Sequence, residues 1–178
     1  NIKKWTSLQY AVFNGHSKIV SILLDQPDIE TDTMTAEDET LLHLACISDK
    51  ADIVDMLINN PNLQNKFDLN AKTSNGRTPL QIALLNGNYD IVSLLLNIDD
   101  KKGKKKSNKK QSNIDPNIPA NNGQAPLIIA CEMKRNDIFN ILIKHSEIDV
   151  NAQLSTGKSV LYIACELNMT EMIQKLLS

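Results

Sequence analysis

The stretch GRTPLQIALLNGNYDIVSLLL, residues 76–96, occurs in five related versions along the chain. The other versions begin at Trp5, Glu39, Gly123 and Gly157. Each contains an alanine near its start, a turn, and then two pairs of apolar residues. Five copies of one unit indicate a repeat array, in which each unit contacts only its neighbours.

The alanine shared by all copies measures the period of this array. Its five occurrences, spaced by 34, 38, 47 and 34 residues, are Ala11, Ala45, Ala83, Ala130 and Ala164. Against a period of about 33 residues, the surplus falls after the second block of apolar residues in each copy. We therefore expect repeats at residues 1–29, 30–67, 68–114, 115–148 and 149–178, within a single domain.

Local chemistry predicts two short helices in each repeat. Thr78 is a good N-cap, and Pro79 is tolerated at the first helical position because its missing N–H would have had no partner there. Apolar residues recur three and four positions apart over residues 80–84 and again over 91–96. One repeat cannot bury both apolar stripes alone, so we expect its helices to stack on those of its neighbours.

Several elements in register resemble the ankyrin repeat family. TPLQIA at residues 78–83 is similar to the family signature T-P-L-H-x-A, as are TLLHLA at 40–45 and TSLQYA at 6–11. APLIIA and SVLYIA in the last two repeats are looser versions, and D-x-N elements precede the last three repeats' helices. The resemblance implies an all-α solenoid of stacked helix-turn-helix units with short β-hairpin or turn fingers.

Two departures from the pattern concern loops. Repeat 2 has Asp38 where the later repeats have a glycine before the helix, so we expect its hairpin to be distorted. The surplus residues around Pro61 are expected to form an ordinary longer loop.

A larger insertion, residues 97–113, contains seven lysines: Lys101, Lys102, Lys104, Lys105, Lys106, Lys109 and Lys110. Without apolar residues it is expected to be flexible. Removing these seven charges from the net charge of −2 leaves −9, so the rest of the chain is acidic. The tract could be a tolerated low-complexity insert, as the 20 asparagines of the chain suggest, a nuclear import signal, or a contact for a polyanion. It has no aromatic residues, so sequence-specific nucleic-acid recognition is not expected.

No motif of an enzyme is present. The chain lacks H-E-x-x-H, C-x-x-C, glycine-rich phosphate loops and G-x-S-x-G elbows. The family resemblance implies that His43 ties neighbouring turns together by hydrogen bonds. Cys46, Cys131 and Cys165 each follow the shared alanine and are expected to fill one core position. We expect a non-catalytic protein without cofactor or metal.

Composition suits one globular domain, with 42% apolar and 22% charged residues. No run of about 18 apolar residues is long enough to span a membrane. We expect an intracellular location, cytoplasmic or nuclear, and a monomer. The last repeat ends on Leu177 without a polar terminal repeat, so the natural protein is expected to continue.

The resemblance implies binding of a protein partner in a concave groove and at the hairpin tips. Near the end of each first helix the series reads Phe13, Ile47, Leu85, Glu132 and Glu166, with Met133 beside it. Three apolar residues here predict an exposed strip for an amphipathic helix or an extended segment, whose basic end the glutamates would meet. The alternative is that helix tilt half-buries the strip. The hairpin candidates are Lys72, Ser74, Asn75, Asn121, Asn122 and Ser155.

Two other functions stay open: an adaptor that acts through the lysine tract, and a regulatory module of a larger enzyme or channel.

Overall fold

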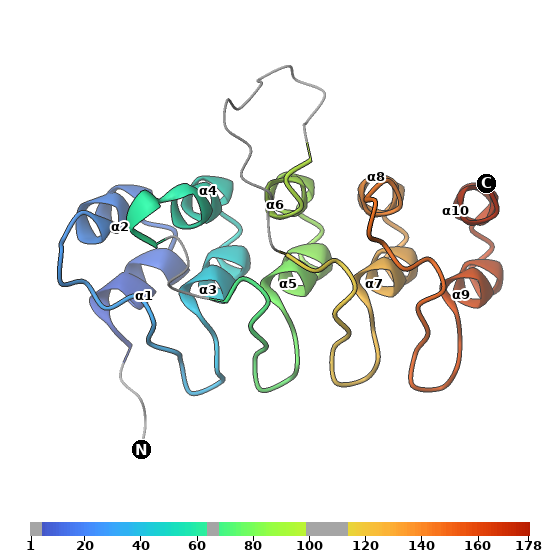
Figure 1. The fold of residues 1–178 in the computed structure, drawn as a ribbon, viewed down its shortest axis with the longest axis horizontal. Coiled ribbons are helices and arrows are strands. Elements are labelled where there is room, and N and C mark those ends of the chain that lie inside the picture. The colour runs from blue at the N-terminus through green and yellow to red at the C-terminus, as the bar shows by residue number, and fades with distance from the viewer. Residues whose placement is uncertain (1–4, 64–67, 99–113) are drawn as a thin grey trace.

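The computed structural model describes residues 5–63, 68–98 and 114–178. Within them the chain forms ten α-helices in two parallel rows, with a row of loops extending beyond the first (Figure 1). The first row consists of α1 (Ser7–Phe13), α3 (Leu41–Ile47), α5 (Pro79–Leu85), α7 (Pro126–Glu132) and α9 (Val160–Glu166). The second row consists of α2 (Ser17–Leu24), α4 (Ala51–Asn59), α6 (Tyr89–Leu95), α8 (Asn136–Leu142) and α10 (Thr170–Leu176). The predicted all-α repeat solenoid is confirmed.

The first helix of most repeats begins at a hydroxyl N-cap. Thr6, Thr40 and Thr78 each accept a hydrogen bond from the backbone N–H three residues on, and the side chain of that residue accepts one from the backbone N–H of the cap. Ser159 makes only the first of these two bonds. Ala125 begins α7 without any side-chain cap, because it has no acceptor to offer.

A left-handed residue separates the two helices of every repeat. The predicted turn positions Gly15, Asp49, Gly87, Lys134 and Asn168 all have positive φ, between 54° and 70°. A residue in this conformation cannot continue a right-handed helix, so the chain reverses there. This geometry sets the second helix beside the first.

The four described hairpins are held by the same pair of backbone bonds. In repeat 3 the N–H of Thr73 bonds to the carbonyl of Arg77, and the N–H of Gly76 bonds to that of Thr73. Repeat 2 makes the equivalent bonds from Thr35 and Asp38, with Asp38 at φ 60°. The expected distortion of this hairpin is therefore wrong, because aspartate adopts the left-handed conformation more readily than most residues. The only isolated β-bridge of the described residues joins Gln153 and Ser159, so the fingers are turns rather than strands.

The core runs the length of the array between the two rows. It includes Leu8, Leu42, Leu80 and Leu127, which occupy one position of successive repeats and are each at most 1% exposed. The expected plain loop after α4 contains a short 3-10 helix, Pro61–Leu63, and its Leu63 is buried. This insertion therefore adds to the core.

Most of the lysine-rich insertion, residues 99–113, lies outside the described residues, so its expected flexibility stays a prediction.

Candidate protein-binding surface

The series predicted to face a partner occupies one position in every repeat. Each of its five members is the last residue of a first-row helix: Phe13 of α1, Ile47 of α3, Leu85 of α5, Glu132 of α7 and Glu166 of α9. We call these residues the helix-end row. Because the repeats stack in register, the row changes from apolar at the N-terminal end to acidic at the C-terminal end.

The apolar part of the row is less exposed than a continuous strip would require. Phe13 is 42% exposed, and its ring meets that of Trp5 edge to face, with centroids 5.0 Å apart. Ile47 and Leu85 are half-buried and pack against the core. The expectation of three exposed apolar residues is thus correct for Phe13 alone. Met133, next to the row, is exposed.

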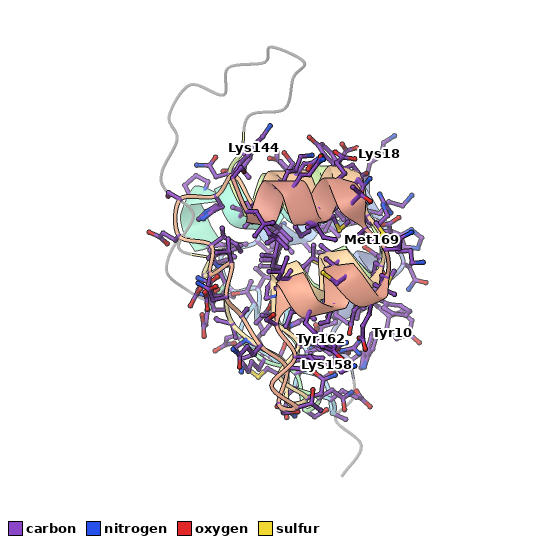
Figure 2. All side chains as sticks on the ribbon, turned by 90° about the vertical axis from the view of Figure 1, so that its right-hand side faces the viewer. Tyr10, Lys18, Lys144, Lys158, Tyr162 and Met169 are labelled. Atoms are coloured by element: carbon purple, nitrogen blue, oxygen red, sulfur yellow. The ribbon has the colours of Figure 1, made fainter. Side chains whose placement is uncertain are left out.

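The two glutamates of the row are hydrogen-bonded to side chains of their own repeats. Glu132 accepts a hydrogen bond of 2.6 Å from Nε2 of Gln124, and Glu166 accepts two from Nζ of Lys158, at 2.8 and 2.9 Å. The hydrogen bond to Glu166 raises the pKa of Lys158. Lys158 also lies 5.0 Å from the ring centroid of Tyr162, and the two lie together at the near end of the molecule (Figure 2).

These pairs went unnoticed in the sequence. Their signal is a polar residue directly before the N-cap and an acid eight positions later, at the end of the same helix. Repeats 4 and 5 have it, whereas the corresponding residues of repeats 2 and 3, Ile47 and Leu85, have no polar group. A basic partner segment would therefore compete with Gln124 and Lys158 for the two carboxylates.

The hairpin candidates link one hairpin to the next. Lys72 donates from Nζ to the carbonyl of Pro119 at 2.8 Å, and Asn121 donates to that of Ser74 at 3.3 Å. Ser155 donates to the carbonyl of Asn122 at 3.2 Å. Asn75 is exposed at the tip between these contacts. The tips thus form a connected row, which keeps their outer atoms available to a partner and their spacing fixed.

A buried polar side chain joins each of the first three repeats to the following hairpin. His43 is fully buried, and its Nδ1 accepts from the backbone N–H of Thr40 at 3.1 Å. Its Nε2 must then carry the proton that bonds to the carbonyl of Arg77 at 3.0 Å. Burial lowers the pKa of His43, in keeping with a neutral ring. The role that the family resemblance implied for His43 is confirmed.

In two other repeats a glutamine side chain joins the repeat to the following hairpin, and the sequence analysis did not predict these bonds. Nε2 of Gln81 donates to the carbonyls of Ile118 and Gln124, at 3.0 and 2.8 Å. Nε2 of Gln9 donates to the carbonyl of Thr33 at 3.1 Å. The signal was a hydrogen-bonding side chain at the fourth position of the T-P-L-H motif. Repeat 4 has Ile128 there, and it cannot make this bond.

The cysteines confirm the core position for two repeats and correct it for the third. Cys46 and Cys131 are buried, which raises the pKa of the Cys131 thiol to about 11 and that of Cys46 further still. Cys165 occupies the same position in repeat 5 but is exposed, because the described chain places no repeat against it.

In the residues that the structure describes, no three His, Cys, Asp or Glu side chains group as a metal site. Nor does any helix of those residues have the length and apolar character to cross a bilayer.

All seven lysines proposed to contact a polyanion or an import receptor lie outside the described residues.

A family model that describes three copies of the ankyrin repeat matches the chain over residues 8–109 and again over residues 106–178. No curated protein sequence matches the chain significantly. The family match, the two rows of short helices and the bonds between hairpins all cover nearly the whole described chain, which therefore belongs to the ankyrin repeat family.

Proposed function

We propose that this chain is a protein-binding scaffold that presents the helix-end row and the hairpin tips to one partner segment. The observation that carries this proposal is the graded chemistry of the row, from Phe13 through Ile47 and Leu85 to Glu132 and Glu166. Ankyrin repeats are generally protein-interaction modules, and their framework leaves recognition to surface residues of this kind.

The geometry favours an amphipathic partner helix or an extended segment with one apolar and one basic end. Its apolar end would lie over the Phe13 ring and the adjacent Trp5 indole, because aromatic side chains at such contacts supply much of the binding energy. Its basic end would replace the bonds that Gln124 and Lys158 make to the two glutamates. The fixed spacing of hairpin tips would contribute contacts without an ordering cost.

A displayed library of random 16-residue peptides would test this proposal. We expect selected peptides to carry Lys or Arg toward one end and Leu, Ile or Phe toward the other. Phe13→Glu should weaken the best peptide by ten-fold or more, which corresponds to a loss of about 1.4 kcal/mol. Ile22→Glu is the matched control, since Ile22 is an exposed apolar residue on the second row of helices. Selected peptides without this pattern, or equal weakening by both variants, would contradict the proposal.

The lysine tract supports a second candidate, an adaptor that binds polyanions, because seven of the chain's positive charges gather in residues 101–110. Binding of this kind would fall steeply with salt and disappear when the tract is deleted. Peptide binding through the helix-end row would persist in the tract-deleted chain. Comparing the two chains in the same selection, at two salt concentrations, separates the candidates.

A further inference from the structure

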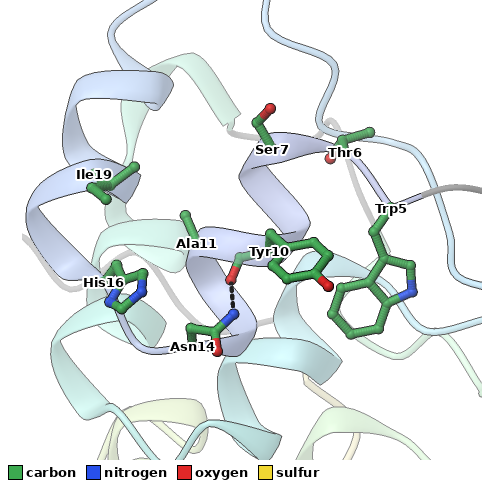
Figure 3. Close-up of a pocket in the computed structure, with 8 residues that line it drawn as sticks. All are labelled: Trp5, Thr6, Ser7, Tyr10, Ala11, Asn14, His16 and Ile19. Carbon is green, nitrogen blue, oxygen red and sulfur yellow. Dashed lines mark hydrogen bonds between the residues drawn. The ribbon is translucent and has the colours of Figure 1, made fainter.

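A second row of residues runs beside the helix-end row. Its members stand directly before the N-caps of the first-row helices, and we call them the pre-cap row: Trp5, Glu39, Arg77, Gln124 and Lys158. In repeat 1 the ring of Trp5 lies against that of Tyr10 (Figure 3) and also meets the ring of Phe13, eight residues further along. In repeats 4 and 5 the pre-cap residue bonds to the glutamate eight positions on. A pre-cap residue and the helix-end residue of the same repeat are therefore neighbours.

Arg77 is a pre-cap residue whose helix-end neighbour offers it no acceptor, because that neighbour is Leu85. Four lysine and arginine side chains of the described residues are partly buried. Three of them pair with a carboxylate: Arg135 with Asp137, Lys158 with Glu166, and Lys175 with Glu171. The fourth is Arg77, and within the described residues no acceptor bonds to its guanidinium. Arg77 is thus an unpaired cation in the middle of the proposed binding surface.

The pre-cap residues of the two adjacent repeats are bonded to other groups. Oε2 of Glu39 accepts from Oγ1 of Thr35 at 3.0 Å, and the backbone N–H of Glu39 donates to the same hydroxyl at 3.1 Å. These bonds hold the Glu39 carboxylate on its own hairpin. On the other side, Gln124 donates to Glu132 and accepts from Nδ2 of Asn122 at 2.7 Å. Neither neighbour in the row therefore neutralises Arg77.

The backbone of Arg77 is fixed from two sides. Its carbonyl accepts from the N–H of Thr73 and from Nε2 of His43, both at 3.0 Å. Its N–H donates to Oγ1 of Thr73 at 3.3 Å. A side chain that starts from an immobilised backbone loses less freedom when a partner binds it. The hairpin therefore presents the guanidinium at a defined place on the surface.

We propose that Arg77 binds a carboxylate side chain of the partner segment and so determines the charge in the middle of that segment. This inference rests on the proposed function, to which it adds an acidic residue between the apolar and the basic end. One guanidinium matches one carboxylate in charge, and its planar N–H groups can make two parallel bonds to it. Arg135 makes such a pair of bonds to Asp137, at 3.1 and 2.9 Å.

The partial burial of Arg77 favours this ion pair over one at a fully exposed site. Part of the water around the guanidinium has already been removed on folding, which lowers the further desolvation that pairing requires. Solvent and salt also screen a partly buried pair less than an exposed one. Arg77 is therefore a better anchor for an acid than the exposed lysines of the described residues.

The stacking of the repeats predicts where this acid stands in the partner. Arg77 lies one repeat from Glu132 and two repeats from Phe13. Neighbouring packed helices are about 8–10 Å apart. The acid should therefore stand about three residues from the basic residue in an extended partner, and about six residues from it in a helical one.

A double-mutant cycle with the peptides selected from the displayed library tests this inference. The best peptide is compared with a variant in which its central acid is replaced by the matching amide, Asp by Asn or Glu by Gln. Arg77→Gln should weaken binding of the acidic peptide by about five-fold or more and leave binding of the amide peptide unchanged. The difference between wild type and Arg77→Gln should decrease as the salt concentration rises.

Arg135→Gln is the matched control, since Arg135 is the other arginine of the chain and already pairs with Asp137 near the start of α8. It should bind both peptides like the wild type. Circular dichroism spectra of the variants verify that they are folded.

Three results would overturn the inference and leave the proposed function standing, provided that the peptides still lose affinity for Phe13→Glu. They are selected peptides without a central acid, equal binding of the acidic peptide by wild type and Arg77→Gln, and an equal loss for the acidic and the amide peptide. The last of these would assign the Arg77 side chain a structural role. A selection that yields no peptide dependent on Phe13 would overturn the inference together with the proposed function.

Discussion

His43 gives the fold a sensitivity to acid that the glutamine of other repeats avoids. Its ring is buried and neutral, with Nδ1 accepting from Thr40 and Nε2 donating to Arg77. Because burial lowers its pKa in the folded chain, the unfolded chain takes up the proton first as the pH falls below about 6.5. Stability is therefore unaffected by this group at higher pH and decreases below that value.

We predict that His43→Gln reduces this acid-side loss, since Gln81 makes both bonds in repeat 3 without titrating. Between pH 7.5 and 5.5 the variant should lose about 1 kcal/mol less of its free energy of unfolding than the wild type. Urea denaturation at the two pH values measures the difference. Replacing the exposed His16 by glutamine controls for the loss of an imidazole. Parallel pH profiles for wild type and His43→Gln would contradict the role assigned to the buried ring.

Asp38 preserves the hairpin of repeat 2 at a conformational cost. It has φ 60°, where the equivalent residues of repeats 3–5 are glycines with φ between 74° and 81°. Asp38→Gly should raise the free energy of unfolding by about 0.5–1 kcal/mol. Asp49→Gly should gain less, because Asp49 is also left-handed but accepts a bond from Asn88. Thermal or urea denaturation of both variants measures this, and a loss of stability in Asp38→Gly would show that its carboxylate supports the turn.

At the scale of elements, α7 is the first-row helix without a side-chain N-cap. Ala125 has the extended backbone of the threonine caps, with φ −72° and ψ 156°. Ala125→Thr would add an acceptor for the N–H of Ile128 and should stabilise the chain by about 1 kcal/mol. Ala125→Val is the control, because it matches threonine in shape and lacks the hydroxyl. Equal stabilisation by both residues would assign the gain to packing instead.

The elements themselves could be predicted from the sequence because their signals are local. Thr78-Pro79 marks a helix start, and the turn residues such as Gly87 follow the shared alanine at a fixed distance. The surface could be predicted less well. The half-burial of Leu85 depends on how the helix is tilted against its neighbours, and the bond from Lys158 to Glu166 joins a hairpin to the far end of a helix. Such relations arise from packing between elements, which a single sequence does not encode locally.

At the scale of the whole molecule, stability depends on the interfaces between neighbouring repeats. Repeats 1, 2 and 3 each donate a buried side-chain bond to the next hairpin, from Gln9, His43 and Gln81. Repeat 4 has Ile128 at this position, so repeat 5 is joined without that bond. Repeat 5 also leaves the side chains of Tyr162, Cys165 and Leu177 exposed. It is therefore the least supported unit of the described chain.

We predict from this difference that the array opens from its C-terminal end. Hydrogen exchange of a dilute sample should be fastest in α9 and α10, intermediate in α1 and α2, and slowest in the central first-row helices. Mass spectrometry of peptides from each helix measures this order. Faster exchange in α1 than in α9 would contradict it, because the hydrogen bond from Gln9 to the carbonyl of Thr33 should keep repeat 1 packed on repeat 2. Because α9 ends at Glu166, a partner that occupies the helix-end row should slow exchange there first.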